Sequence, residues 1–310
     1  MERRKKIVTQ GLFIAGDWGT TRLRLALCDQ SGFLERKAGA SAVASSQSPQ
    51  SAFFSLADDW RRDHGPLPLY LCGMVGSRNG WRETAYAPCP ADPRTLRAAA
   101  LHFEAEGHPV SIVPGLTCTN PLGAPDVMRG EETQILGAIL LHPALSHGRH
   151  LLALPGTHTK WVALEDGSVQ RFMTTPTGEL FALLRAHSTL TKAAPDTQAA
   201  TPAGFAAGVA RSREVQKRTG LLQTLFETRT RQLIDGMKAE DAVGFLSGLL
   251  IGGDVDGALD CFGVPDQVHL IGEPNLSALY AEALAGTGVA SERLDGTDCA
   301  FAGLRAIFER

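Results

Sequence analysis

The sequence of 310 residues has no excess of basic residues, no long apolar run and no C-x-x-C pair of cysteines. Lys and Arg number 30 against 33 Asp and Glu, and the resulting net charge of −3 argues against nucleic acid as a partner. No apolar run reaches the roughly 18 residues that cross a bilayer. The basic stretch at residues 3–6 precedes an apolar run too short for a signal peptide, so we expect a cytoplasmic protein.

The six cysteines, at positions 28, 72, 89, 118, 261 and 299, are scattered without a C-x-x-C pair. This spacing indicates neither a zinc site nor a disulfide framework. The chain does have a hydrophobic content of 44% and a charged content of 20%, both near the average for globular domains. Its length predicts a sizeable core and two domains, which we place at residues 1–140 and 141–310.

The most informative stretch is a hairpin near the N-terminus, residues 12–27. An apolar run turns sharply at residues 16–19 and resumes as a strand of alternating polarity. Glycine lets backbone amides approach an anion, and the hydroxyls of Thr20 and Thr21 can donate to phosphate oxygens. Asp17 cannot donate to a phosphate, so its expected role is to hold Mg²⁺. An ordinary β-hairpin is the alternative, because Asp and Gly are common in turns.

A second hairpin with the same pattern lies in the middle of the chain. A strand predicted at residues 150–154 turns through Pro155-Gly156-Thr157-His158-Thr159-Lys160 and returns from Trp161. Because both hairpins share a strand–Gly-Thr–strand pattern, we interpret the chain as a structural duplication, with two unrelated turns as the alternative. The glycine and threonines can again donate to a phosphate, and Lys160 supplies a point charge.

A third polar turn, Gly272-Glu273, follows a strand predicted at residues 269–271 and opens a helix from Leu276. This arrangement suits adenosine, since glycine permits close approach and an acid can accept hydrogen bonds from ribose hydroxyls. Strand–Gly–helix turns are common, so the turn gains weight only from its position after two phosphate hairpins.

Two adjacent acids, Glu131 and Glu132, lie between the hairpins at the start of a predicted helix. The helix dipole favours carboxylates there, which is the ordinary structural explanation. One of them could instead accept the proton of a substrate hydroxyl as a general base. Neighbouring helical side chains point about 100° apart, so only one can do this, and we favour Glu131.

A polar loop, residues 73–81, follows a strand predicted at residues 67–72, which is where α/β folds bind ligands. Its candidate substrate contacts are Gly76, Ser77, Arg78, Asn79 and Trp81. We add Arg129, because an arginine can bind a carboxylate in bidentate fashion. A surface salt bridge is the alternative for each arginine, and packing is the alternative for Trp81.

Elsewhere the periodicity predicts a helix over residues 95–106 and an irregular stretch over 115–126. Residues 178–242 are expected to be mostly helical. An apolar helix over 245–251 is predicted to end at the Gly-Gly-Asp that follows it, and a last helix covers 299–308.

Together these motifs resemble the 2-dehydro-3-deoxygalactonokinase family of the actin/hexokinase/Hsp70 superfamily. The resemblance runs from about Ile14 to the C-terminus. The strings that carry it are D-W-G-T-T-x-x-R from Asp17, G-M-V-G-S-R-N-G-W from Gly73, M-R-G-E-E-T-Q from Met128, L-P-G-T-H-T-K-W from Leu154, P-T-G-E-L-F from Pro176 and I-G-E-P-x-L-x-x-L-Y from Ile271.

The resemblance implies an α/β fold of two ribonuclease-H-like domains with a nucleotide cleft between them. It implies ATP and Mg²⁺ as cofactors, and transfer of the γ-phosphoryl group to the terminal hydroxyl of 2-dehydro-3-deoxy-D-galactonate in galactonate breakdown. The residues it assigns to the nucleotide and its metal are Asp17, Gly19, Thr20, Thr21, Gly156, Thr157, His158, Thr159, Lys160, Gly272, Glu273 and Leu276. One departure is Pro155, since the superfamily usually carries an Asp there, and Asp17 is left without an obvious partner in metal binding.

Other functions stay open. The Glu-Glu-Thr placement is also similar to the Glu-Glu-Ala of exopolyphosphatases, where a Glu positions the attacking water, so a phosphohydrolase is one alternative. A kinase of the gluconate-derived 2-keto-3-deoxy acid is another, since the two acids differ at one stereocentre. A sensor on a kinase fold would usually need an added DNA-binding segment. The expected partner is a small-molecule sugar acid, without nucleic acid or membrane, and a homodimer stays open.

Overall fold

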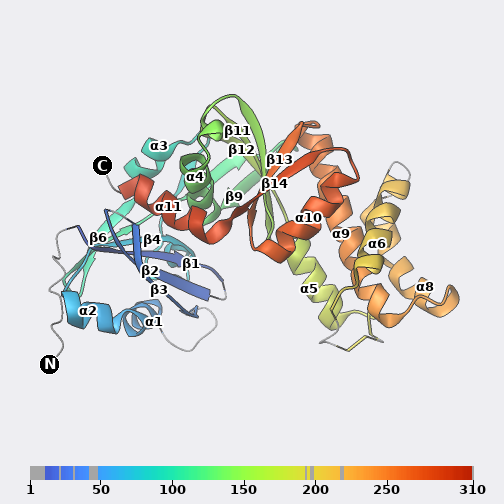
Figure 1. The fold of residues 1–310 in the computed structure, drawn as a ribbon, viewed down its shortest axis with the longest axis horizontal. Coiled ribbons are helices and arrows are strands. Elements are labelled where there is room, and N and C mark those ends of the chain that lie inside the picture. Colours follow the sequence, from blue (N-terminus) through green and yellow to red (C-terminus); the bar gives the residue numbers. More distant parts are fainter. Residues whose placement is uncertain are drawn as a thin grey trace.

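The computed structural model describes residues 11–20, 22–30, 32–41, 48–192, 194–195, 199–216 and 220–308. It has two α/β halves side by side, and a group of helices extends from the second half (Figure 1). Each half is built on one main sheet, and a small third sheet accompanies them.

The first half contains a six-stranded sheet with the strand order β3-β2-β1-β4-β7-β6. The first three strands are antiparallel, β4 and β7 continue parallel to β1, and β6 returns antiparallel. Their bounds are β1 (Phe13–Trp18), β2 (Arg22–Asp29), β3 (Gly32–Ala40), β4 (Leu69–Gly73), β6 (Leu101–Ala105) and β7 (His108–Ile112).

The second half contains a five-stranded sheet with the order β12-β11-β10-β13-β14. It again starts with three antiparallel strands and continues with parallel ones. Its strands are β10 (Arg149–Leu154), β11 (Thr159–Glu165), β12 (Ser168–Thr175), β13 (Gln267–Gly272) and β14 (Ala290–Asp295). Five strands therefore follow one another in the same order in both halves, which confirms the predicted duplication and the fold of two ribonuclease-H-like units.

The two faces of the first sheet have different covers, because successive residues of a strand point to opposite faces. Ile14 packs in a cluster with Phe53 of α1 (Pro49–Leu56) and Trp60 of α2 (Asp58–His64). Ala15 packs in the other cluster, with residues of α4 (Glu131–Leu141) and α11 (Gly296–Phe308).

The helices α4 and α11 cross closely between the halves (Figure 1). A Cβ added at Gly137 would lie 1.7 Å from the carbonyl oxygen of Cys299, and one at Gly303 would lie 1.9 Å from that of Thr133. Only glycine allows this approach. The C-terminal helix therefore packs on the first half as well as the second, and the boundary at residue 140 stays a prediction.

The small sheet consists of β5 (Tyr86–Pro88), β8 (Gly115–Thr119) and β9 (Pro125–Met128). The strands β8 and β9 fall in the stretch that was expected to be irregular. That expectation was wrong because paired strands this short carry little periodicity of their own.

The helix expected over residues 95–106 is also wrong. The helix α3 (Pro93–Ala98) ends early, and the strand β6 follows it. Leu101, Phe103 and Ala105 pack against the core while His102 and Glu104 are exposed. This alternation has the period of two that is typical of a strand. A stretch of five residues is too short for periodicity alone to distinguish a strand from a helix.

The predicted mostly helical region is confirmed, and it holds α5 (Thr177–His187), α6 (Pro202–Gln216), α7 (Leu221–Leu225) and α8 (Glu227–Ile234). The next helix, α9 (Ala239–Phe262), does not stop at Gly252 as predicted. A Cβ at Gly248 would lie 2.1 Å from the carbonyl oxygen of Phe205, and one at Gly252 would lie 2.2 Å from the hydroxyl of Ser212. These glycines let α6 cross α9 closely and do not end the helix.

Among the described residues, α9 is the one helix that is long and apolar enough to cross a membrane by length and composition. Its apolar window is 89% buried inside the protein, as in the core helix of a globular domain. The remaining elements are α10 (Pro274–Ala285) and two short 3₁₀ helices, η2 (Met74–Gly76) and η3 (Pro143–Ser146).

Candidate active site

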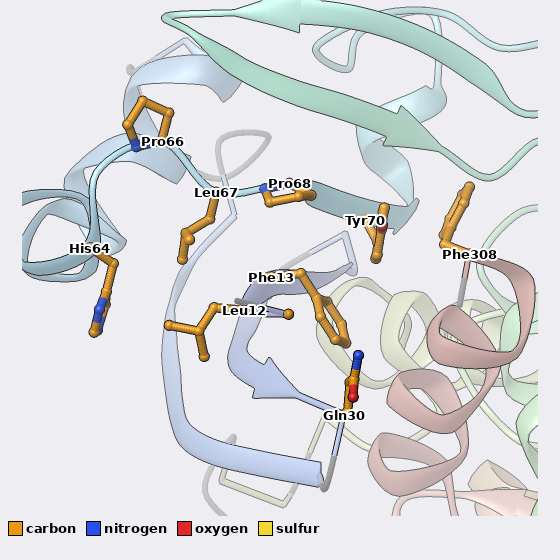
Figure 2. Close-up of a pocket in the computed structure, with 10 residues that line it drawn as sticks. Leu12, Phe13, Gln30, His64, Pro66, Leu67, Pro68, Tyr70 and Phe308 are labelled. Carbon is orange, nitrogen blue, oxygen red and sulfur yellow. The ribbon is translucent and has the colours of Figure 1, made fainter. Parts of the chain in front are cut away.

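A cavity of about 470 Å³ lies between the two halves, where the turns that follow β1, β10 and β13 meet the start of α4. The predicted site residues that line it are Asp17, Gly19, Thr20, Arg129, Glu131, Gly156, Thr157, His158, Lys160, Gly272 and Glu273. All three predicted turns therefore face one space. A larger hollow of about 830 Å³ lies at the opposite end of strands β1 and β4, between Leu12, Pro68, Tyr70 and Phe308 (Figure 2). No predicted site residue lines it, so we do not take it as the site.

Asp17 lies at the end of β1, directly opposite Arg24 on β2. Arg24 Nη1 is 3.1 Å from Asp17 Oδ2, and the aspartate is 6% exposed. Burial raises the pKa of Asp17 by more than the Arg24 charge lowers it, and the nearby Glu131 charge raises it further. The negative charge here is therefore only partly compensated, and a bound cation would favour it.

The turn of the first hairpin is closed by a hydrogen bond from the Gly19 amide to the Arg22 carbonyl (2.9 Å). Thr20 is exposed at the cavity. Thr21, the other predicted phosphate donor, lies outside the described residues.

The two adjacent glutamates of α4 occupy different environments. Glu131 Oε1 is 3.0 Å from Lys160 Nζ, and its Oε2 accepts a hydrogen bond from the Arg129 amide (3.1 Å). Its side chain is 23% exposed and lines the cavity. Glu132 is fully buried, and its oxygens accept hydrogen bonds from the Gly130 amide (2.6 Å) and the Thr133 hydroxyl (3.0 Å). Burial and then the Glu131 charge raise the pKa of Glu132 to about 8. Of the two, only Glu131 is open to a substrate.

The second hairpin presents its backbone and Lys160 to the cavity. Lys160 is almost fully buried, and Nζ also donates to the His158 carbonyl (3.1 Å). His158 itself forms a pair with Glu179 at 2.8 Å. Thr159 does not line the cavity, because its hydroxyl is fully buried and bonded to the Tyr280 hydroxyl (2.8 Å).

A buried carboxylate, Asp254 of α9, is hydrogen-bonded to the second hairpin on the side away from the cavity. It accepts hydrogen bonds from Trp161 Nε1 (2.9 Å) and the Tyr280 hydroxyl (2.5 Å). It also accepts from the hydroxyls of Thr175 (2.8 Å) and Thr177 (2.7 Å). Four donors satisfy one buried charge, so β11, β12, α5 and α10 are tied to the same point. No local motif marks Asp254, so this network is not predictable from the sequence.

The predicted residues of the third turn line two different cavities. Glu273 lines the main cavity and caps α10, since its Oε2 accepts from the Leu276 amide (2.9 Å). Leu276 instead lines a neighbouring, largely apolar cavity of about 360 Å³. The other residues around that cavity include Gly156, Thr177, Phe181, Leu279 and Tyr280.

The loop of residues 73–81 folds back behind the cavity wall, and none of its five predicted substrate contacts lines the cavity. Ser77 bonds the Met74 carbonyl (2.8 Å), Arg78 is 87% exposed and 3.9 Å from Glu83, and Asn79 is exposed. Trp81 packs against Phe53, Phe54 and Phe103, which is the alternative considered from the sequence.

Gly76 has a structural task within this loop. A Cβ there would lie 2.6 Å from the Thr84 hydroxyl and 2.8 Å from Arg129 Nη1. The glycine therefore leaves room for Thr84 and Arg129 to meet at the cavity wall.

Several lining residues were not predicted, namely Arg24, Tyr86, Gln134, Asp295 and Thr297. Arg24 could have been predicted, because the register of the tight hairpin places it directly opposite Asp17. Tyr86 and Asp295 have no motif around them, and only the tertiary fold brings them to the site.

No group of three or more His, Cys, Asp or Glu side chains in the described part of the chain is placed to bind a metal ion. Mg²⁺ does not require such a cage, since it keeps several waters and is held by one or two carboxylates together with substrate phosphates. Asp17, buried beside the cavity with its charge partly compensated, fits that role.

The duplicated fold, with a Gly-Thr hairpin from each half facing one cavity, defines a phosphotransferase of the actin-like ATPase class. Residues 17–307 match the family described as 2-keto-3-deoxy-galactonokinase, and the chain belongs to this family. The resemblance seen in the sequence is thereby confirmed.

Named relatives agree with this assignment. The chain is 38% identical over 307 residues to the "Probable 2-dehydro-3-deoxygalactonokinase" of Rhizobium meliloti (strain 1021), covering 97% of each protein. It is 33% identical over 297 residues to the 2-dehydro-3-deoxygalactonokinase of Escherichia coli (strain K12), covering 95% of this chain and 97% of that one. A crystal structure from Sinorhizobium meliloti, assigned as a 2-dehydro-3-deoxygalactonokinase protein, matches with a TM-score of 0.84 and 37% identity, over 96% of this chain and 100% of that chain.

Proposed function

We propose that the protein transfers the γ-phosphoryl group of ATP to the terminal hydroxyl of 2-dehydro-3-deoxy-D-galactonate, giving the 6-phosphate, in galactonate catabolism. The names of its relatives support this acceptor. The observation that carries the proposal is the position of Glu131, an accessible carboxylate between two Gly-Thr hairpins in one cavity.

The nucleotide would lie along the second half. The exposed hydroxyls of Thr20 and Thr157 and the backbone at Gly156 are available to its phosphates. The apolar cavity next to Gly156 suits the adenine ring, and Glu273 at its edge can accept from the ribose. Leu276 would then contact the base from the wall of that cavity.

Asp17 would hold Mg²⁺, directly or through water. When bound, Mg²⁺ neutralises charge on the transferring phosphoryl group. Lys160, from the other half, adds a fixed positive charge to the same cavity. The protein's own contribution is positioning of the reactants and exclusion of water when the halves close.

Glu131 would take the proton of the acceptor hydroxyl. Its two oxygens are oriented by Lys160 and by the Arg129 amide, which leaves the carboxylate fixed at the cavity wall. Glu132 cannot reach a substrate, and its bond to the Gly130 amide suggests that it holds the turn before α4.

We further propose a cytoplasmic enzyme that works on this small sugar acid without nucleic acid or membrane, with a homodimer to be tested by size-exclusion chromatography. The accessible carboxylate could also serve a hydrolase, but the relatives' names favour a kinase.

The deciding experiment measures ADP formation with Mg²⁺ in the presence and absence of the galactonate-derived acid and of its gluconate-derived epimer. We expect turnover that depends on the galactonate-derived acid. Glu131→Gln should lower kcat by about 10²–10⁴-fold, as expected for loss of a general base. Glu132→Gln should have a smaller effect, and Glu104→Gln, on the exposed face of β6, serves as the matched control.

Phosphate release without an acceptor would move the protein to the hydrolases, and equal use of the epimer would widen its acceptor range. A loss of kcat in Glu132→Gln but not in Glu131→Gln would reject Glu131 as the base.

A further inference from the structure

Three groups surround Arg129 at the cavity wall, and two of them have no assigned role. Arg129 Nη1 donates to the Thr84 hydroxyl, and Nη2 donates to the Thr84 carbonyl (2.9 Å). The carbon at the centre of the guanidinium group lies 4.4 Å from the centroid of the Tyr86 ring. The Arg129 amide bonds the carboxylate of Glu131.

Thr84 thus binds one edge of the guanidinium group and Tyr86 packs over one face. The edge that contains Nε is not held by Thr84. Nε of Arg129 is buried and has no hydrogen-bond partner. A buried charged donor without a partner is unfavourable, so the arrangement gains from an anionic ligand. The edge formed by Nε and one Nη has the fork geometry that binds a carboxylate through two parallel hydrogen bonds.

The Tyr86 ring contacts both Arg129 and the backbone of β8. A Cβ at Gly115 would lie 2.6 Å from the Tyr86 ring, so the ring rests directly on the backbone of β8. Thr84 is fixed in turn, because its amide bonds the Gly76 carbonyl (2.9 Å). The side chain of Tyr86 is nevertheless 42% exposed and lines the cavity.

We propose that Tyr86 and Thr84 are positioning residues that hold Arg129 for the carboxylate of the acceptor, and that they set the preference for acidic over neutral acceptors. The inference rests on the proposed function in taking a sugar acid as the acceptor. Since the backbone of Arg129 is bonded to Glu131, one turn of the chain fixes both the carboxylate grip and the base. An open-chain acid with a carboxylate at one end and a hydroxyl at the other fits this arrangement.

The test compares the keto-acid with its carboxamide, which has the same shape and no charge, in wild type, Tyr86→Leu and Tyr86→Phe. Loss of the ring should raise KM for the acid about five- to tenfold, the range expected for one cation–π contact. KM for the carboxamide, KM for ATP and kcat should change less than about twofold. Tyr86→Phe keeps the ring and should behave as wild type. Tyr70→Leu, in the hollow at the opposite end of β1 and β4, is the matched control.

An equal rise of KM for acid and carboxamide in Tyr86→Leu would show a merely structural role, and an unchanged KM for both would remove Tyr86 from the site. Either result overturns the proposal. If wild type phosphorylates neither compound, the proposed function fails on its own. Calorimetric titration of the acid then tests the role of Tyr86, since equal Kd values for wild type and Tyr86→Leu would overturn it.

Discussion

The two hairpins share one backbone plan but differ in how their charges are used. In β1–β2, Asp17 faces Arg24 across the same hairpin, and the two form an ion pair. In β10–β11, the returning strand carries Lys160, which pairs with Glu131 of the other half. The aliphatic Leu154 lines the cavity at the end of β10, where β1 presents Asp17.

This difference shows how a duplicated unit can acquire two roles. The backbone, glycines and hydroxyls that suit phosphates are kept in both hairpins. Of the two hairpins and the start of α4, the first half supplies the carboxyl groups at the cavity, Asp17 and Glu131, while Lys160 brings a cation from the second. Mg²⁺ and base chemistry are thereby expected on one side, and phosphate charge neutralisation on the other.

Among changes within the two hairpins, replacing Asp17 should have the largest effect, because it removes the carboxylate that the second hairpin lacks. Asp17→Asn keeps the shape but cannot supply the charge for Mg²⁺ and leaves Arg24 unpaired. We expect kcat/KM to fall by about 10²–10³-fold, the scale of losing one preorganised electrostatic group, and the Mg²⁺ concentration at half-maximal rate to rise.

Titrating Mg²⁺ in the steady-state assay checks this prediction, with Asp63→Asn on the exposed face of α2 as the control. An unchanged Mg²⁺ requirement in Asp17→Asn would separate Asp17 from the metal.

Sequence reasoning succeeded where the signal is local. Both hairpins combine an apolar strand, a glycine turn and hydroxyl residues within about a dozen positions, so their pattern predicts the structure without reference to the rest of the chain. The same holds for the start of α4, where Glu131 and Glu132 precede an apolar helix.

It failed where a residue serves a distant partner. The sequence pattern predicts a helix end at Gly252, but this glycine accommodates Ser212 of α6. The substrate contacts predicted in the loop of residues 73–81 stay a prediction, while the role of its Gly76 in making room for Arg129 has no local signal. Tyr86 and Asp254 carry no local signal at all, because their significance comes from side chains more than 20 positions away.

The acidic first half should also respond to pH. The pKa of Glu132 is raised to about 8 in the folded state from an ordinary value of 4.5. Between these values the folded protein keeps a proton that the unfolded chain has released, so the free energy of unfolding should fall as pH rises through this window and level off above it. The slope for one such group is about 1.4 kcal/mol per pH unit.

Urea unfolding from pH 5 to pH 8 measures this slope. Glu132→Gln should flatten it, and Asp17, whose pKa is also raised by burial, acts in the same direction. Glu104→Gln should follow wild type. A Glu132→Gln variant that lost stability with pH as steeply as wild type would show that Glu132 is not the group responsible.

The smallest expected effect sharpens the comparison of the two hairpins themselves. Thr20 and Thr157 are both exposed hydroxyls at the cavity, one from each half. If the duplication kept phosphate binding in both hairpins, Thr20→Val and Thr157→Val should each raise KM for ATP. The rise should be about three- to tenfold, because a typical hydrogen bond contributes about 0.5–1.5 kcal/mol after exchange with water. Thermal stability should be unchanged, since neither hydroxyl is buried. Should only one variant bind ATP more weakly, the two hairpins would have diverged in their hydroxyl groups as well as in their charges, and phosphate contact would belong to that hairpin alone.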